Sequence, residues 1–570
     1  QEDEDEDEED EQLSKNKRKN DMMSKGKHFK KEPSVKTIRQ LLRNMKEDGI
    51  NIPETFSKYR FGGKSEGYKV LQEIVFNDLP YDKESGDKLS TLISSEVQND
   101  KQRTAYLKNY SPKIREILVS VLNKQYENSS VSELTKNNIA FLSKENTFTI
   151  TTGHQLNLFT GPLYFLYKII STIKLTEELK KKYPSYKFVP IYWMATEDHD
   201  FDEINYFNFK GKKFKWDKES SGPVGRLSTD GLQEILSVFE KELGSGSNGN
   251  EIKKLFESAY TNIDSLANAT RKLANELFGS YGLVIIDADN SQLKRQFIPY
   301  IKEELLQNTS YKKVSETLVE LKKYPTQVNP REINLFYIED NLRERILFEE
   351  GVFKINNTKT TFSQNGLLEL LETKPEKFSP NVILRPLYQE VILPNLCYIG
   401  GGGEIGYWLE LKTTFEAYKC TFPILLLRNS ALLVSKKQKD KMEKLQLNWE
   451  QLFAKQEALI NSKVNEIAEI PIDFSEQKIA LQKQFSDLHT IANQTDKSFL
   501  GAVKAQEAKQ IKGLENLEKR FLKAQKKKYE LELNRITYLQ NELFPNQSLQ
   551  ERHANFSEFY LETGKALISN

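Results

Sequence analysis

Cysteine and long apolar runs are both scarce in this chain. Its 570 residues include only Cys397 and Cys420, which form neither a metal-type spacing nor a disulfide framework and so suit a reducing compartment. No apolar run approaches the roughly 20 residues that cross a bilayer, and the N-terminus is charged where a signal peptide would be apolar. We therefore expect a soluble, cytoplasmic protein without a membrane partner.

Net charge is also nearly absent. The 83 basic and 82 acidic side chains cancel, so no overall field attracts nucleic acid, and we expect no nucleic-acid partner. Histidine is rare too: the five histidines are scattered and form no HExxH spacing, which argues against a zinc site. The sequence leaves the identity of any metal unknown.

Changes in composition and periodicity divide the chain into five segments. The first opens with QEDEDEDEEDEQ and continues with a Lys-rich stretch, which is too polar to build a packed core. The whole chain is long enough for two or three domains. We predict a disordered charged extension at 1–33, a mainly helical segment flanking the core at 34–145, an α/β catalytic core at 146–431 with an insertion at about 328–410, a coiled-coil hairpin at 432–545, and a C-terminal segment at 546–570 that packs back on the core.

Strand-like and helical patterns alternate across the core. Apolar, strand-like runs at 146–152, 188–195, 281–287 and 422–427 are separated by amphipathic stretches such as 266–278. This alternation is typical of an α/β fold with a doubly wound, mostly parallel sheet. Right-handed βαβ connections place the loops after the first two strands at the carboxyl edge of that sheet. We therefore expect a ligand site where these two loops meet.

The loop after the first strand carries the first candidate site residues. Gly153 permits a tight turn beside His154, and the helix that begins near Pro162 directs unpaired N–H groups toward the crevice, where phosphate or carboxylate would bind. Thr160 either caps that helix or binds the ligand. We predict His154 as a catalytic residue and, as substrate- or nucleotide-binding residues, Thr152, Gly153, Gln155, Asn157, Thr160 and Gly161.

An acidic cluster follows the second strand. Glu197, Asp198, His199 and Asp200 combine carboxylates, which suit Mg²⁺, with a histidine that titrates near neutral pH. Side chains of these types are also common as helix caps and in ion-pair networks, which is the alternative interpretation. We predict Asp198, His199 and Asp200 as catalytic residues and Glu197 as a ligand-binding residue.

The remaining candidates lie in and after the insertion. Arg331 and Arg385 suit a carboxylate or phosphate because a guanidinium binds either group through two hydrogen bonds, and each is equally able to be a structural ion-pair partner. Four successive glycines from Gly400 allow backbone amides to approach a ligand, although the run is neither GxGxxG nor a Walker loop. We predict ligand binding by Arg331, Asn334, Arg385, Gln389, Gly401, Gly402, Glu404, Tyr407 and Arg428.

Long helical patterns rich in Lys, Glu and Gln follow residue 432. Leu514, Leu517 and Phe521 step by three and four residues, as apolar positions do along a helical seam. Pro471 marks a break, so we predict an antiparallel helical hairpin over about 432–543. An exposed hairpin with an apolar seam favours pairing with a second copy, and we expect a homodimer. Packing within a single chain is the alternative.

Four long motifs occur in one order along the chain: TTGHQLNLFTGPLYFLYKIISTIKL, PIYWMATEDHDFDEIN, VNPREINLFYI and FSPNVILRPLYQEVILPNLCYIGGGGEIGYWLELK. Together with the helical hairpin, they closely resemble the bacillithiol biosynthesis cysteine-adding enzyme family over roughly residues 100–570. Several long motifs in the same order make this resemblance specific.

The resemblance implies a Rossmann-like core with insertions, a dimerising coiled coil and a cytosolic ligase that joins cysteine to glucosaminyl-malate in the last step of bacillithiol synthesis. The family's fold is related to nucleotidylyl transferases and class I aminoacyl-tRNA synthetases, which bind ATP phosphates with an H-x-G-H turn. Here Thr151 stands in the similar place of the first His, and His154 in that of the second. Because an amide forms only from an activated carboxylate, ATP and Mg²⁺ are the expected cofactors.

Two other functions stay open. A nucleotidylyl transferase of other specificity would use the same crevice without consuming cysteine. A catalytically degenerate scaffold of a thiol-biosynthesis assembly would tolerate Ala at His154 and Asp200 but would fail when Leu517 and Phe521 become charged. An enzyme would show the opposite sensitivity at the first pair of residues.

Overall fold

The computed structural model describes residues 110–569. Within them, 110–431 together with 554–569 form one compact unit, and Leu432–His553 form a second. The predicted disordered extension at 1–33 and most of the predicted helical segment, 34–109, lie outside the described residues. None of the described helices has the length and apolar content that crossing a membrane requires.

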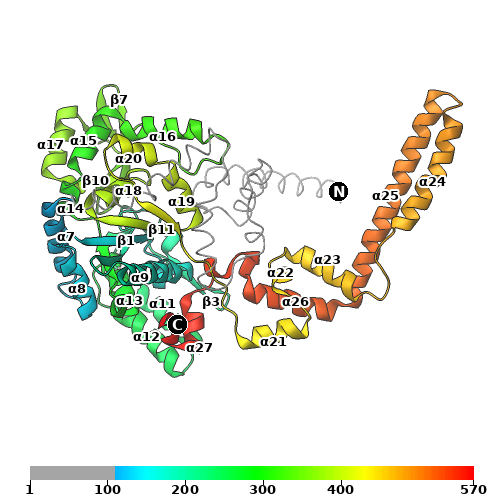
Figure 1. Cartoon of the computed structure of the whole chain (residues 1–570), viewed down its shortest axis with the longest axis horizontal. Helices are drawn as coiled ribbons and strands as arrows, with labels where there is room; N and C mark the ends of the chain where they lie inside the picture. The colour runs from blue at the N-terminus through cyan, green and yellow to red at the C-terminus, as the bar shows by residue number, and fades with distance from the viewer. Residues whose placement is uncertain (1–109, 570) are drawn as a thin grey trace, which may run out of the picture. The chain divides into compact units, whose positions relative to one another are not determined.

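A five-stranded parallel sheet forms the centre of the first unit (Figure 1). Its spatial order is β12-β11-β1-β2-β5, with β1 at Thr147–His154, β2 at Lys187–Met194, β5 at Val284–Asp287, β11 at Asn395–Gly400 and β12 at Ile424–Leu427. The chain starts in the middle, moves outward to β5, and then returns to the other side of β1. The predicted α/β class with a Rossmann-like, doubly wound parallel sheet is confirmed, and its strand order reverses between β1 and β11.

Strand register brings the ends of neighbouring strands level with one another. His154 pairs with Met194, Met194 with Asp287, and Gly400 with Leu427. All eight residues of β1 are buried, as expected for a central strand that is covered on both faces. Side chains that follow these strands therefore share one edge of the sheet.

Helices cover this sheet and space its strands. α9 (Tyr164–Lys182) connects β1 to β2 and packs on both strands, and α13 (Leu266–Phe278) leads into β5 over the residues predicted for it. The other helices of the unit are α7 (Pro112–Gln125), α8 (Glu133–Phe141), α10 (Phe201–Ile204), α11 (Leu232–Leu243), α12 (Ser247–Tyr260), α14 (Ser291–Arg295), α15 (Ile298–Gln307), α16 (Thr309–Glu320), α17 (Gln364–Thr373), α18 (Leu384–Ile392), α19 (Gly402–Leu409) and α20 (Lys412–Ala417).

A second sheet is built from the inserted region. It is antiparallel with the order β10-β6-β7-β8-β9, from strands β6 (Leu335–Glu339), β7 (Leu342–Glu349), β8 (Val352–Ile355), β9 (Thr361–Phe362) and β10 (Phe378–Pro380). A short hairpin of β3 (Tyr206–Phe209) and β4 (Lys212–Lys215) lies apart from both sheets. The predicted insertion at about 328–410 extends too far, because β11 belongs to the parallel sheet and pairs with β1.

The second unit is entirely helical within the described residues. Its helices are α21 (Lys436–Lys444), α22 (Trp449–Leu452), α23 (Gln456–Ile467), α24 (Ser475–Ala492), α25 (Lys497–Lys528) and α26 (Glu530–Leu543). Only α24 and α25 form the long antiparallel hairpin, which is shorter than the hairpin predicted over 432–543. Helix caps at Ser435 and Asn448 divide the first arm into short helices, and these pack on α26 around Leu452, Val464 and Ile536.

The chain returns to the first unit at Ala554. α27 (Phe556–Thr563) and α28 (Ala566–Ser569) follow it, and the backbone oxygen of Ala554 accepts a hydrogen bond from the amide of Leu163 at 2.8 Å. The residues 546–553, which were predicted to pack on the core with the rest of the C-terminal segment, belong to the helical unit instead.

Ile536 and Leu531 provide a matched test of the helical unit's core. Ile536 is fully buried and Leu531 is 70% exposed, on the same helix. We expect Ile536→Ala to lower the free energy of unfolding of this unit by about 2–5 kcal/mol, because it leaves a cavity. Leu531→Ala should change it by less than about 0.5 kcal/mol. Urea titration followed by circular dichroism measures both, and equal effects would contradict the assigned core.

Candidate functional site

His154 ends β1 beside the point where the strand order reverses. Its Nδ1 lies 2.9 Å from the backbone oxygen of Gln155, and because a carbonyl only accepts hydrogen bonds, Nδ1 carries the proton. The Nε2 atom therefore holds a lone pair, and it has no hydrogen-bond partner among the described residues. The ring is only 6% exposed and stacks on Tyr164 at 5.2 Å between centroids. His154 is thus a buried acceptor.

Its surroundings keep this imidazole neutral. Burial, followed by the nearby charge of Lys168, lowers the pKa of His154 from 6.5 to about 3. The carboxylate of Glu404 opposes this shift without reversing it. At neutral pH His154 can accept a hydrogen bond from an amine or hydroxyl, whereas a phosphate oxygen would have no proton to donate to it.

A buried ion pair connects β1 to the start of α19. Lys168 Nζ lies 2.5 Å from Glu404 Oε2 and donates to the backbone oxygen of Gly153 at 2.6 Å. Glu404 also accepts hydrogen bonds from the Tyr398 hydroxyl at 2.7 Å and from the Gly401 amide at 2.8 Å. Burial alone would raise the pKa of Glu404, but Lys168 and these donors lower it, so the carboxylate is ionised.

The glycines here serve close packing within the chain. A Cβ on Gly153 would lie 3.0 Å from the Tyr398 hydroxyl, and one on Gly400 would lie 3.0 Å from Glu404 Cβ. The Gly401 amide is already bonded to Glu404. Ligand binding by Gly401 and Gly402 stays a prediction.

Two arginines add positive charge at this edge. The guanidinium of Arg385 lies 5.8 Å from the ring centroids of Trp193, Tyr398 and Trp408 and donates to Gln389 Oε1 at 3.0 Å. Arg428 lies over the Tyr164 ring at 5.1 Å, and its amide donates to the Gly400 oxygen at 2.8 Å. Burial alone would lower the pKa of Arg385, but the nearby Tyr407 phenol raises it.

The loop after His154 holds further polar atoms. Thr152 donates its hydroxyl hydrogen to the Ile399 oxygen at 2.8 Å, across the sheet. Asn157 Nδ2 donates to the Glu203 oxygen at 3.1 Å. Buried and without hydrogen-bond partners among the described residues are Gln155 Oε1, Asn157 Oδ1 and Thr160 Oγ1. With His154 Nε2, this loop offers several buried acceptors.

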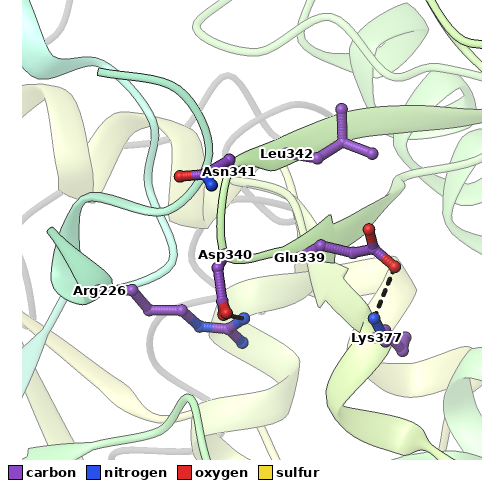
Figure 2. Close-up of a pocket in the computed structure, with 6 residues that line it drawn as sticks. All are labelled: Arg226, Glu339, Asp340, Asn341, Leu342 and Lys377. Atoms are coloured by element: carbon purple, nitrogen blue, oxygen red, sulfur yellow. Dashed lines mark hydrogen bonds and ion pairs between the residues drawn. The ribbon is translucent and has the colours of Figure 1, made fainter. Parts of the chain in front are cut away.

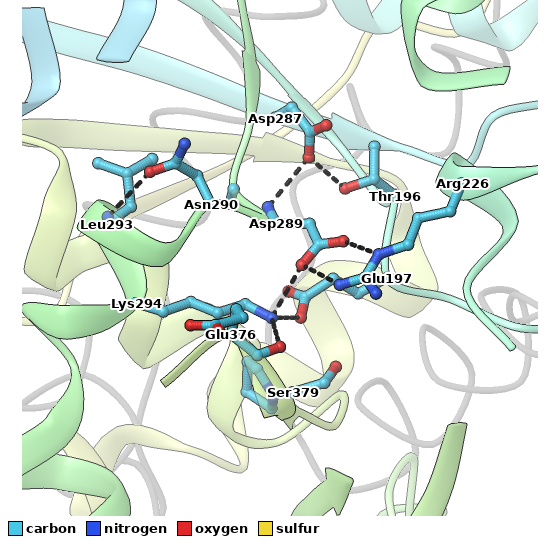
Figure 3. Close-up of polar contacts among 12 residues, drawn as sticks. Thr196, Glu197, Arg226, Asp287, Asp289, Asn290, Leu293, Lys294, Glu376 and Ser379 are labelled. Atoms are coloured by element: carbon cyan, nitrogen blue, oxygen red, sulfur yellow. Dashed lines mark hydrogen bonds and ion pairs between the residues drawn. The ribbon is translucent and has the colours of Figure 1, made fainter. Parts of the chain in front are cut away.

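A second charged cluster lies at the ends of β2 and β5 (Figure 3). Lys294 Nζ lies 2.6 Å from Glu197 Oε1 and 3.0 Å from Asp289 Oδ1, and Arg226 Nε lies 2.7 Å from Asp289 Oδ2. Although burial raises the pKa of Asp289, the charges of Lys294 and Arg226 lower it to about 2. Thr196 donates to the carboxylate of Asp287, which ends β5. These charges neutralise one another inside the protein.

Asp198, His199 and Asp200 follow β2 and have three different sets of contacts. Gln155 Nε2 donates to Asp198 Oδ2 at 2.5 Å, which links the loops after β1 and β2 as expected. His199 Nδ1 lies 2.8 Å from Arg343 Nη1. Because the guanidinium only donates, His199 carries its proton on Nε2, and that atom cannot accept another. Asp200 caps α10 through the amide of Glu203, the alternative raised from the sequence.

Arg331 and Asn334 have other surroundings. Arg331 is exposed, and its amide donates to Asn334 Oδ1 at 3.0 Å. Asn334 is fully buried and donates to Ser310 Oγ at 2.7 Å and to Glu304 Oε1 at 3.3 Å. These contacts give Asn334 a structural role, and ligand binding by the two residues stays untested.

The sequence did not reveal Lys168, Asp289, Lys294 or Arg343. Lys168 had one available signal, because it stands between Phe165 and Ile169 on the apolar face of α9, where a charged side chain needs a buried partner. Asp289 and Lys294 follow a predicted strand closely enough to have been considered. Arg343 gave no local signal, since its partner His199 lies 144 residues away.

A surface hollow of about 450 Å³ lies at the turn between β6 and β7 (Figure 2). Its charged lining is paired within the chain: Arg226 Nη1 lies 3.0 Å from Asp340, and Lys377 lies 2.6 Å from Glu339. Asn341 and Leu342 complete it. These pairs leave the hollow without an evident ligand-binding group.

Residues 110–569 contain no group of three or more His, Cys, Asp or Glu side chains that could hold a metal ion. The acidic residues Glu197 and Asp289 are neutralised by Lys294 and Arg226. These two carboxylates are therefore already paired, and the expected Mg²⁺ stays a prediction.

Family models match nearly all of the described chain. The model described as "Bacillithiol biosynthesis BshC, N-terminal Rossmann-like domain" matches residues 73–429, and "Bacillithiol biosynthesis BshC, C-terminal coiled-coil domain" matches residues 431–570. The chain belongs to the BshC family. The resemblance inferred from the motifs is confirmed, and the BshC match begins upstream of the expected residue 100.

Curated relatives agree with this assignment. A Flavobacterium johnsoniae protein is 65% identical over 469 residues, covering 82% of this chain and 89% of the relative. Proteins from Cytophaga hutchinsonii and Bacillus cereus are 38% and 31% identical, covering 80% and 79% of this chain and 85% and 86% of the relatives. All three bear the name "Putative cysteine ligase BshC". The prediction that this BshC-family chain is an enzyme of the ligase class is confirmed.

A solved structure titled a putative arginyl-tRNA synthetase from Campylobacter jejuni is 11% identical and covers 80% of this chain and 98% of its own. Its TM-score is 0.20. A likeness this low carries no argument about the BshC fold or its chemistry.

The low pKa of His154 makes stability depend on pH. The unfolded chain takes up a proton at this residue near pH 6.5, whereas the folded chain does so only near pH 3, so stability is present above pH 6.5 and is lost as pH falls. We expect His154→Phe, which keeps the ring stacking, to reduce the loss of stability between pH 6.5 and 4, by up to about 1.4 kcal/mol per pH unit. The pKa of Asp289 is lowered from 3.8 to about 2, so its protonation changes stability only at pH values below this window. Urea titrations at several pH values measure it, and equal slopes would contradict a buried neutral His154.

Proposed function

We propose that this chain joins cysteine to glucosaminyl-malate by an ATP-dependent amide-forming reaction, the last step of bacillithiol synthesis. Support comes from the family, from the printed names of its relatives, and from one observation at the site. That observation is the Nε2 lone pair of His154, which has no hydrogen-bond partner within residues 110–569 and lies where the strand order of the sheet reverses. It is suited to accept a hydrogen bond from the amine that attacks an activated carboxylate.

His154 takes the first role in this proposal. Its neutral ring receives the hydrogen bond of the glucosaminyl amine, and the Nδ1 bond to Gln155 keeps the lone pair directed away from the backbone. The pKa of about 3 makes His154 a weak base, so it orients the amine, and Asp198 is the proposed acceptor of the proton. Asp198 is tied to the same loop through Gln155.

Anionic groups of the substrates are proposed to meet the cationic side. Lys168 and Arg428 lie near His154, and Arg385 lies near Tyr398 and Glu404. A guanidinium binds phosphate or carboxylate through two hydrogen bonds. We assign Arg385 to the malyl carboxylates or the ATP phosphates, and Arg331 remains the second candidate.

ATP supplies the activation that amide formation needs. Mg²⁺ is proposed to enter with the nucleotide and to be held by phosphate oxygens, since Mg²⁺ commonly uses few protein ligands. The Gly401 amide is bonded to Glu404, so Gly402 is the glycine of α19 whose backbone amide is proposed to bind an anion.

A second copy of the chain is proposed to cover the apolar surface of the hairpin. Large apolar side chains on α24 and α25 are between 41% and 64% exposed: Ile479, Leu488, Ile491, Phe499 and Leu517. Such a run on a long exposed hairpin is typical of a helical interface. A cytoplasmic homodimer is the proposed assembly.

Ligation is tested by mass spectrometry of the purified chain with cysteine, glucosaminyl-malate, ATP and Mg²⁺. We expect bacillithiol together with AMP, and His154→Ala should lower kcat/KM about 100-fold. His489→Gln, a histidine of the helical unit that pairs with Glu507, is the control and should keep full activity. ADP in place of AMP would indicate an acyl phosphate.

Other results would favour the alternatives. Nucleotide turnover without cysteine consumption would support a nucleotidylyl transferase. No product with any nucleotide, together with pathway function that survives Ala at His154 and Asp200, would support the scaffold.

Sedimentation velocity tests the homodimer. Leu517→Glu combined with Ile491→Glu should shift the chain to monomer, because four charges would be buried in a symmetric interface. Val319→Glu changes a more exposed apolar residue of the first unit, at 71% exposure, and should leave the dimer intact. A wild-type chain that sediments as a monomer would contradict the proposal.

A further inference from the structure

Three successive residues near the site have left-handed backbone conformations. The φ angles are 49° at Phe159, 68° at Thr160 and 61° at Gly161. A bulky aromatic residue and a β-branched residue rarely adopt this conformation, and each costs on the order of 1–3 kcal/mol there. The turn at 159–161 therefore needs surrounding contacts to hold it.

Asn555, from the returning C-terminal segment, supplies the central contact. Its Nδ2 donates to the backbone oxygen of Phe159 at 2.8 Å and to that of Gly161 at 2.7 Å. Asn555 is fully buried. One amide group thus bonds the residues before and after Thr160, which fixes the direction of both peptide planes.

The orientation of this amide is itself fixed. Asn555 Oδ1 accepts hydrogen bonds from the amide of Ser557 at 3.0 Å and from its hydroxyl at 2.6 Å, at the start of α27. α27 is held on the first unit by a hydrogen bond from the Tyr560 hydroxyl to Glu251 at 2.7 Å. With Oδ1 engaged in this cap, Nδ2 must face the turn.

Two buried oxygen atoms lie on residues in and next to this turn. Asn157 Oδ1 and Thr160 Oγ1 are buried, on residues that are 7% and 3% exposed, and neither has a hydrogen-bond partner among the described residues. A Cβ at Gly161 would lie 2.5 Å from Asn157 Cβ, so the turn's conformation also limits where Asn157 can lie. Buried acceptors of this kind suit a ligand that donates hydrogen bonds.

We propose that Asn555 is a positioning residue, which holds the 159–161 turn so that Asn157 and Thr160 meet the hydroxyl or amine donors of the amino-sugar substrate. This deepens the proposed function and rests on it for the identity of the substrate. The C-terminal segment then supports the substrate site indirectly, through the 159–161 turn.

Asn555→Ala removes both donors, and Asn555→Asp keeps the cap on Ser557 while placing an acceptor against two carbonyl oxygens. Tyr560→Phe is the matched control, because it loosens α27 without touching the turn. Hydrogen exchange of the full-length chain should show faster exchange at residues 159–163 in both Asn555 variants. Calorimetry should show the Kd for glucosaminyl-malate raised about tenfold in them. In Tyr560→Phe, neither the exchange at residues 159–163 nor the Kd for glucosaminyl-malate should change.

The two readouts separate the possible failures. Unchanged exchange at 159–163 in both Asn555 variants would show that Asn555 does not hold the turn. Faster exchange with an unchanged Kd would overturn the positioning role. If the wild-type chain binds no glucosaminyl-malate, the proposed function fails and the substrate assignment with it, while exchange still decides whether Asn555 holds the turn.

Discussion

The site depends on how the buried hydroxyl groups of the central strand find hydrogen-bond partners inside the parallel sheet. β1 is buried throughout, yet it carries Thr149 and Thr151, whose hydroxyls both donate to Asn395 Oδ1 at 3.1 and 2.8 Å. Asn395 in turn donates to Glu390 at 2.8 Å. Unpaired hydroxyls in such an interior are costly, so these bonds favour one register between β1 and β11. That register brings His154 and Gly400 out at the same edge, where the sheet's strand order reverses.

Charge at this edge is arranged in two different ways. The cluster around Lys294 is internally compensated, with Glu197, Asp289 and Arg226 in mutual ion pairs. Around His154, Glu404 pairs with Lys168, and His154 itself stays neutral with an Nε2 atom that has no hydrogen-bond partner among the described residues. A compensated cluster stabilises the loops that carry it, whereas the buried acceptor of His154 is available to a ligand that donates a hydrogen bond. The proposed chemistry therefore belongs to the β1–β11 side, and Asp198 is its link to the other cluster.

Local periodicity predicted the elements well and the contacts poorly. The run 146–152 became β1 at Thr147–His154, and 266–278 became α13 with the same bounds. The contact between Gln155 and Asp198 across neighbouring loops followed from the handedness of βαβ units. The boundary of the insertion was wrong because β11 pairs with a strand about 250 residues earlier, which periodicity cannot register. The contacts of Arg343 and Asn555 were not predicted for the same reason, because their partners are distant in sequence.

During synthesis, the turn that follows β1 is made long before Asn555, the residue that holds it. Asn555 is translated 396 residues after Phe159, a delay of about 20–80 s at a translation rate of about 5–20 residues per second. Through that interval the sheet can form strand by strand while its left-handed turn has no clamp. A nascent chain that still lacks its last residues therefore holds a folded core with an unfinished crevice. On the proposed role of Asn555, the substrate reaches its full affinity only after that residue has been translated.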